Sequence, residues 1–137
     1  MTGILALIYQ LHSVWRWALL IIVVVAGVKF LIGWLSRQQV KAVDITLGNL
    51  FAGFMTIQFV LGLINLIGYI SIGTFNQRIH AEHALYGLIA VGLSHALPLR
   101  KTDRPDVARF RTSFFMILIG LVLVLLSVIR LRGGWVW

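Results

Sequence analysis

Long runs of apolar residues constrain the fold of this chain more than any other feature. Three such runs cover residues 4–34, 45–70 and 114–129, and a fourth, residues 84–93, follows a histidine-rich stretch. A helix needs about 20 apolar residues to cross the hydrocarbon core of a bilayer. Only 12% of the residues are charged, against roughly 25% in an average soluble domain, and the mean hydropathy is +0.96. We therefore expect an integral membrane protein.

Short polar connections divide the 137 residues into four predicted membrane helices within a single domain, residues 1–137. The predicted spans are residues 4–34, 45–70, 78–97 and 112–130. Short connections make consecutive helices antiparallel neighbours. The sequence thus predicts an all-α, integral membrane four-helix bundle of up-down-up-down topology. Gly48, Gly53, Gly62 and Gly68 of the second span indicate close helix packing, as small residues do in membrane bundles.

The basic residues predict the orientation of these helices. The net charge is +8. Seven basic residues lie in or beside the first and third connections: Arg37, Lys41, Arg100, Lys101, Arg104, Arg109 and Arg111. Lysine- and arginine-rich loops stay in the cytoplasm, so both termini should lie outside. We expect these charges to contact anionic lipid and expect no nucleic-acid partner. Residues 1–11 lack a basic start and a cleavage site, so the first run should remain a helix.

All four histidines lie in or beside predicted spans: His12 in the first, and His80, His83 and His95 in the third. Ionisable groups at membrane depth are costly, which makes them functional candidates. His12 lies about 12 Å and His83 about 10 Å from the outer ends of their helices, at 1.5 Å per residue. We therefore expect these two rings to face each other. The match requires the first helix to project beyond the membrane near Lys29.

Two facing imidazoles form a ligand set for haem iron. Neutral imidazole binds iron well, and two histidines leave no open coordination position, which suits electron transfer. The absence of cysteine excludes thiolate metal sites, iron–sulfur clusters and covalent c-type haem. We predict one haem b whose iron is bound by His12 and His83. The alternative is that each histidine only donates a hydrogen bond to a neighbouring helix.

Two arginines and one further histidine are candidates for binding the same haem. Arg16 lies one turn from His12 on the same helix face, and it would grip a propionate or pair with Glu82. Arg78 lies nearer the outer surface and is the alternative propionate ligand, although it can also pair with Glu82 at i,i+4. His80 is expected to support the ligand histidine, to carry a proton, or only to lie at the interface.

The remaining polar residues indicate no hydrolytic or group-transfer chemistry. The sequence contains no pair of buried carboxylates, no recognisable serine–histidine–aspartate set and no phosphate-binding loop. His95 has no histidine at its depth, so we expect a structural role or a place at the edge of a quinone pocket. These observations favour an electron-transfer protein over a self-contained enzyme.

Four short strings resemble the small four-helix bacterial membrane proteins labelled cytochrome b-like. They are LHSVWRW at 11–17, IQFVLGL at 57–63, EH at 82–83 and GGWVW at 133–137. The similarity covers nearly the whole chain. It implies a multi-pass protein of the bacterial inner membrane and carries the ligand positions over to His12 and His83. One departure is Thr56, where relatives often have a histidine, so anything bound by that residue would be lost here.

Three function classes are compatible with the sequence. The first is a b-type cytochrome that passes electrons within or beside a respiratory or photosynthetic complex, in contact with lipid and with other membrane subunits or a redox partner. The second is a structural accessory subunit without a cofactor, packed against a larger complex. The third is a small transporter or proton channel using His80, Glu82 and His83, although no acidic relay continues across the membrane.

Overall fold

The described residues of this protein are entirely helical. The computed structural model describes residues 3–132, so the predicted interfacial tail at 133–137 lies outside the described part. The helices are α1 (Gly3–Leu35), α2 (Ala42–Ser71), α3 (Gln77–His95), the short 3-10 helix η1 (Pro98–Arg100) and α4 (Asp106–Arg132). The predicted all-α fold is confirmed. Helices α1, α2 and α4 are long and apolar enough to cross a membrane, whereas α3 is shorter and richer in polar residues.

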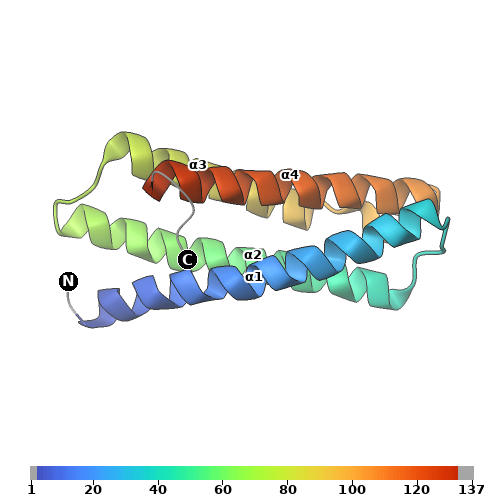
Figure 1. The fold of residues 1–137 in the computed structure, drawn as a ribbon, viewed down its shortest axis with the longest axis horizontal. Coiled ribbons are helices and arrows are strands. Elements are labelled where there is room, and N and C mark those ends of the chain that lie inside the picture. The colour runs from blue at the N-terminus through green and yellow to red at the C-terminus, as the bar shows by residue number, and fades with distance from the viewer. Residues whose placement is uncertain (1–2, 133–137) are drawn as a thin grey trace.

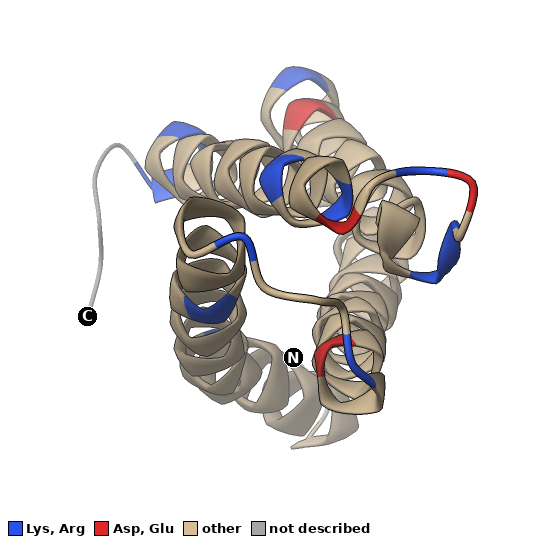
Figure 2. Ribbon diagram, turned by 90° about the vertical axis from the view of Figure 1, so that its right-hand side faces the viewer, with Lys and Arg blue, Asp and Glu red and all other residues tan. Residues whose placement is uncertain are grey.

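The four long helices form a closed ring. Helix α1 contacts α2 and α4, and α3 contacts the same two helices, while α1 and α3 lie diagonally opposite without backbone contact in the described part. Figure 1 shows that residues 36–41 and 96–105 connect helices at one end, here called the basic end. At the opposite, open end, residues 72–76 connect α2 to α3, α1 begins and α4 finishes. Figure 2 looks onto the basic end and shows lysines and arginines on both connections.

Two helices begin earlier than their apolar runs predict, because acidic side chains stabilise their first turns. Helix α2 begins at Ala42, and the carboxylate of Asp44 accepts a hydrogen bond from the Lys41 N–H at 2.8 Å. Helix α4 begins at Asp106 rather than at residue 112, and Asp106 accepts from the Val40 N–H at 3.0 Å. Acidic groups are favourable at helix N-termini, so residues predicted as loop are helical here.

An aromatic core fills the basic half of the ring. Phe30 and Phe110 are fully buried, with ring centroids 6.1 Å apart, and Phe51 packs in the same cluster. A Cβ atom on Gly33 would lie 2.8 Å from the Phe110 ring. Glycine is therefore required here for the close approach of α1 and α4.

Of the four α2 glycines predicted to allow close packing, three do so. A Cβ on Gly48 would lie 2.7 Å from Leu99, one on Gly62 would lie 3.0 Å from His12, and one on Gly68 would lie 2.8 Å from Leu5. At Gly53 the expectation was wrong, because no atom lies within 4 Å of an added Cβ.

Lys29 forms an ion pair and a hydrogen bond with other parts of the chain. Its ammonium group lies 3.0 Å from the carboxylate of Asp44 and donates to the side chain of Gln38 at 3.1 Å. The side chain of Asp44 is only 1% exposed. This ion pair connects α1 to the first turn of α2 and stabilises the basic end.

Candidate functional site

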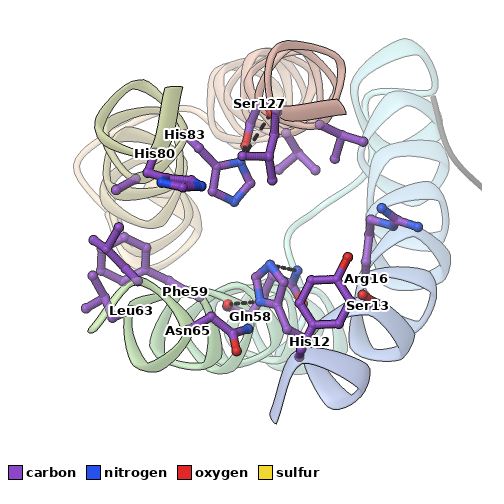
Figure 3. A pocket seen from close by; sticks show the side chains of 18 of the residues that line it. His12, Ser13, Arg16, Gln58, Phe59, Leu63, Asn65, His80, His83 and Ser127 are labelled. Carbon is purple, nitrogen blue, oxygen red and sulfur yellow. Dashed lines mark hydrogen bonds between the residues drawn. The ribbon is translucent and has the colours of Figure 1, made fainter. Parts of the chain in front are cut away.

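A cavity occupies the half of the ring nearest the open end, and all four long helices line it. The cavity has a volume of about 110 Å³. Apolar walls come from residues such as Met55, Phe59, Leu66 and Val128. Figure 3 shows the polar side chains that project among them, including three of the four histidines.

His12 from α1 and His83 from α3 point toward each other across this cavity (Figure 3). Their ring centroids are 6.2 Å apart, and the ring planes meet at 67°. The two helices lie diagonally opposite in the ring, so their backbones leave the space that the two side chains share. The juxtaposition expected from the depths of the two histidines is present.

Each of these rings is oriented by a main-chain carbonyl. Nδ1 of His12 donates to the carbonyl oxygen of Gln58 at 3.1 Å, and Nδ1 of His83 donates to that of Ser127 at 3.2 Å. The Ser127 hydroxyl also lies 2.5 Å from the same Nδ1 atom of His83. A carbonyl oxygen can only accept, so Nδ1 carries the proton and the lone pair lies on Nε2 in both rings. This anchoring through the other nitrogen is typical of metal-binding histidines.

Gln58 contacts His12 a second time, through its side chain. The amide nitrogen donates to Nε2 of His12 at 3.3 Å, while Oε1 of Gln58 is buried without a hydrogen-bond partner in the described part of the chain. In the sequence, Gln58 was part of the string IQFVLGL in the second span, and it was not a candidate for the site. Its contact with His12 depends on how α1 packs against α2, which no local pattern reveals.

His80 lines the cavity but has the opposite arrangement of ring nitrogens. The Asn76 N–H donates to Nδ1 of His80 at 2.9 Å, so Nε2 carries the proton. The ring stacks on Tyr69 with centroids 4.8 Å apart. With its lone pair used by the start of α3, His80 offers the cavity a hydrogen-bond donor.

The arginines that the sequence singled out separate in space. Arg16 lines the cavity, is 7% exposed, and lies with its guanidinium 5.5 Å from the centre of the Trp17 ring. Arg78 is 78% exposed, pairs with Glu82 at 3.4 Å, and does not line the cavity. Glu82 also pairs with Arg130 at 2.6 Å. No ion pair joins Arg16 to Glu82 among residues 3–132.

Two lining residues at the cavity mouth were missed by the sequence analysis. Arg132 donates a hydrogen bond to the hydroxyl of Tyr9, and its guanidinium lies 5.6 Å from the centre of the Tyr9 ring. Arg132 lies beyond the predicted end of the fourth span at residue 130 and was given no role in the site. The periodicity of α1 places Tyr9 near the face of His12, which was the available signal.

His95 lies outside the cavity. It is exposed, and its Nε2 lies 2.8 Å from the hydroxyl of Thr56 on α2. The Thr56 hydroxyl donates to the carbonyl of Ala52 at 2.8 Å, so it accepts from His95. Thr56 is therefore the hydrogen-bond partner of a histidine that lies outside the cavity.

The ligands available for a metal are few. Among the described residues, no three or more histidine, cysteine, aspartate and glutamate side chains gather as a metal site. A structural zinc ion takes four protein ligands, so the His12–His83 pair alone does not suit it. A metal–imidazole bond of about 2 Å, with the ring centre about 1 Å further, separates two axial rings by about 6 Å. The observed 6.2 Å between the ring centroids leaves room for one metal ion between the two imidazoles.

Comparisons of the chain with protein-family models, with curated proteins and with solved structures find no match.

Proposed function

We propose that this protein is a membrane-embedded b-type cytochrome that holds one haem between His12 and His83 and transfers single electrons. The observation that carries the proposal is the pair of Nε2 lone pairs on two rings with centroids 6.2 Å apart in one cavity. The apolar walls of the cavity would exclude water from the haem plane. A haem supplies reversible one-electron chemistry, and two axial histidines leave its iron no open position for oxygen or substrate.

The membrane arrangement is part of the same proposal. Three helices have the length and composition of membrane spans, and α3 completes an up-down-up-down bundle whose least polar faces meet lipid. The connections at the basic end would lie in the cytoplasm of a bacterial inner membrane, and the open end with both termini would lie outside. A redox partner or neighbouring subunit would then reach the haem most directly at the open end.

Gln58 has two effects on haem binding in this proposal. Its main-chain carbonyl keeps the proton of His12 on Nδ1, which leaves Nε2 able to bind iron. Its side-chain amide donates to that same Nε2 and must swing away before iron binds. The buried Oε1 has no partner to hold it in place, so this movement breaks only one hydrogen bond.

Titration of the purified protein with haem in detergent tests the proposal. The wild-type chain should give a reducible low-spin spectrum with a stoichiometry of one haem per chain. His12→Ala and His83→Ala should each abolish that spectrum, because one axial bond is lost. His95→Ala is the matched control, since His95 lies outside the cavity, and it should bind haem like the wild type. An unchanged spectrum in both His12→Ala and His83→Ala would exclude the assignment.

A further inference from the structure

We propose that Tyr9, Arg132 and His80 form a carboxylate-binding rim at the mouth of the cavity, which holds the acidic groups of its ligand. The inference rests on the proposed function, because it names how the haem's two propionates are recognised. These three side chains come from α1, α4 and α3, and all of them line the cavity. From the sequence, His80 was a general candidate for haem binding, and Tyr9 and Arg132 were given no role in the site.

Each of the three residues presents a hydrogen-bond donor. The guanidinium of Arg132 is directed at the Tyr9 hydroxyl and lies over the Tyr9 ring. Because Tyr9 accepts that bond, its own hydroxyl proton remains able to donate. The Nε2 proton of His80 follows from the Asn76 N–H that occupies its Nδ1. Charged and neutral donors of this kind bind carboxylates, and an arginine can do so through two nitrogens.

The rim lies further towards the open end than the ligand histidines do. Tyr9 precedes His12, and His80 precedes His83, by three residues each, or about 4.5 Å at the helical rise. Arg132 follows Ser127, the partner of His83, by five residues, or about 7.5 Å. Helices α1 and α3 begin at the open end and α4 finishes there (Figure 1). A planar ligand held by the two histidines would therefore direct its acidic edge towards this rim and towards water.

The charge around the cavity favours an anion. The described residues that line it include Arg16 and Arg132 but no aspartate or glutamate. Glu82, the nearest acidic residue in sequence, pairs with Arg78 and Arg130 outside the cavity. A positive charge beside an apolar cavity attracts a carboxylate strongly, because the local dielectric constant is low.

The two arginines chosen from the sequence are less well placed for this role. Arg16 lies four residues beyond His12 towards the basic half, so it lies deeper in the molecule than the histidine does. Arg78 is 78% exposed and does not reach the cavity. Arg132, rather than Arg78, is therefore the arginine that lines the cavity near the open end.

Metal-free protoporphyrin IX is a probe for the rim that does not depend on iron ligation. It has the same two carboxylates as haem but cannot bind the histidines through a metal. Fluorescence titration of the purified protein in detergent would compare it with its dimethyl ester, which lacks both charges. Arg132→Gln should weaken binding of the diacid about 10- to 100-fold, the value of one or two hydrogen bonds to a charged group. Binding of the ester should not change.

Two further variants sharpen the comparison. Tyr9→Phe removes only a hydroxyl and should weaken binding of the diacid but not of the ester. Arg130→Gln is the matched control: it removes an arginine of the same helix that pairs with Glu82 and does not line the cavity. The control should bind both porphyrins like the wild type. A circular dichroism spectrum equal to that of the wild type would show that each variant is folded.

The outcomes separate the rim from the haem ligation. If the diacid binds through Arg132 but haem gives no spectrum dependent on His12 and His83, the rim stands and the cytochrome proposal fails. If haem is ligated by both histidines but Arg132→Gln binds the diacid as tightly as the wild type does, the rim is excluded and the cytochrome stands. If the wild-type protein binds neither metal-free protoporphyrin IX nor haem, both proposals are excluded.

Discussion

At the scale of single residues, the candidate site depends on which nitrogen of each histidine carries the proton. His12 and His83 donate from Nδ1 to carbonyl oxygens of other helices, whereas His80 accepts at Nδ1 from the start of its own helix. Three histidines line one cavity, and only His12 and His83 keep a lone pair on Nε2. The surrounding main chain, rather than the side-chain type, distinguishes a ligand from a donor.

Gly62 provides the space that His12 needs, so Gly62→Ala should weaken haem binding. The added Cβ would lie 3.0 Å from Cε1 of His12, and the ring would have to shift by a few tenths of an ångström. Metal ligands tolerate displacements of only about 0.5 Å, and we expect about a 10-fold loss of haem affinity in a spectroscopic titration. Gly53→Ala on the same helix meets no atom within 4 Å and should retain wild-type affinity. Equal affinities in the two variants would contradict this role of Gly62.

Gln58→Leu should speed haem binding without changing the final spectrum. The substitution removes the amide that occupies Nε2 of His12 but keeps the main-chain carbonyl that holds Nδ1. One hydrogen bond of about 1 kcal/mol corresponds to roughly a fivefold faster association in stopped-flow mixing. Asn65→Leu, another polar-to-apolar change on the cavity wall of α2, should leave the rate unchanged. A slower association in Gln58→Leu would show that the Gln58 amide promotes haem binding rather than competing with haem for Nε2 of His12.

At the scale of elements, acidic side chains determine where two of the helices begin. Asp44 and Asp106 were assigned to loops because the apolar pattern begins later. Asp44 instead accepts a hydrogen bond from the Lys41 N–H and pairs with Lys29. Asp106 accepts a hydrogen bond from the Val40 N–H and pairs with Arg109. These contacts are made with residues distant in sequence or in the adjoining turn. The helix boundaries therefore follow from hydrogen bonds that hydropathy does not report.

Asp44→Ala should destabilise the junction of α1 and α2. Removing one member of a buried ion pair costs about 3–5 kcal/mol, but the Lys29 side chain is 35% exposed and can be partly hydrated. We expect the free energy of unfolding to fall by about 2–3 kcal/mol, measured by circular dichroism during denaturation in detergent. Asp103→Ala removes an exposed acidic group of the α3–α4 connection and should have little effect. Equal stability of the two variants would show that the pair contributes nothing.

At the scale of the whole molecule, the ring of four helices has two different halves. The basic half is filled by aromatic side chains around Phe30, Phe51 and Phe110. The open half contains the cavity and the polar residues that line it. A rigid packed half and an open half on the same helices suit a protein that holds a cofactor. The packing of one end fixes the separation of the helices that carry the histidines.

The proposed topology can be tested with single cysteines, because the natural chain contains none. Thr74→Cys lies in the α2–α3 connection, and Gln39→Cys and Lys101→Cys lie in the two connections at the basic end; all three positions are exposed. In right-side-out vesicles of the bacterial inner membrane, an impermeant thiol reagent should label only Thr74→Cys. Inverted vesicles should reverse the pattern. Labelling of all three from one side would exclude the up-down-up-down arrangement.

The helical fold could be predicted from the sequence because it depends on local properties. Apolar runs longer than about 20 residues, interrupted by short polar connections, leave few options besides a bundle of helices. The depth of His12 and His83 along their helices is also a local quantity, since each residue adds a constant rise. The similar depth of these two rings was therefore predictable by counting from the outer ends of their helices, whereas the direction of the rings was not.

The partners of the site residues were decided by the tertiary structure alone. The sequence could not tell that Gln58 and Ser127 supply the carbonyls, that Arg132 rather than Arg78 reaches the cavity, or that His80 has its lone pair occupied. These contacts depend on the rotation of each helix about its axis. That rotation is set by packing over the whole ring, and an all-round apolar helix carries no sequence signal that specifies it.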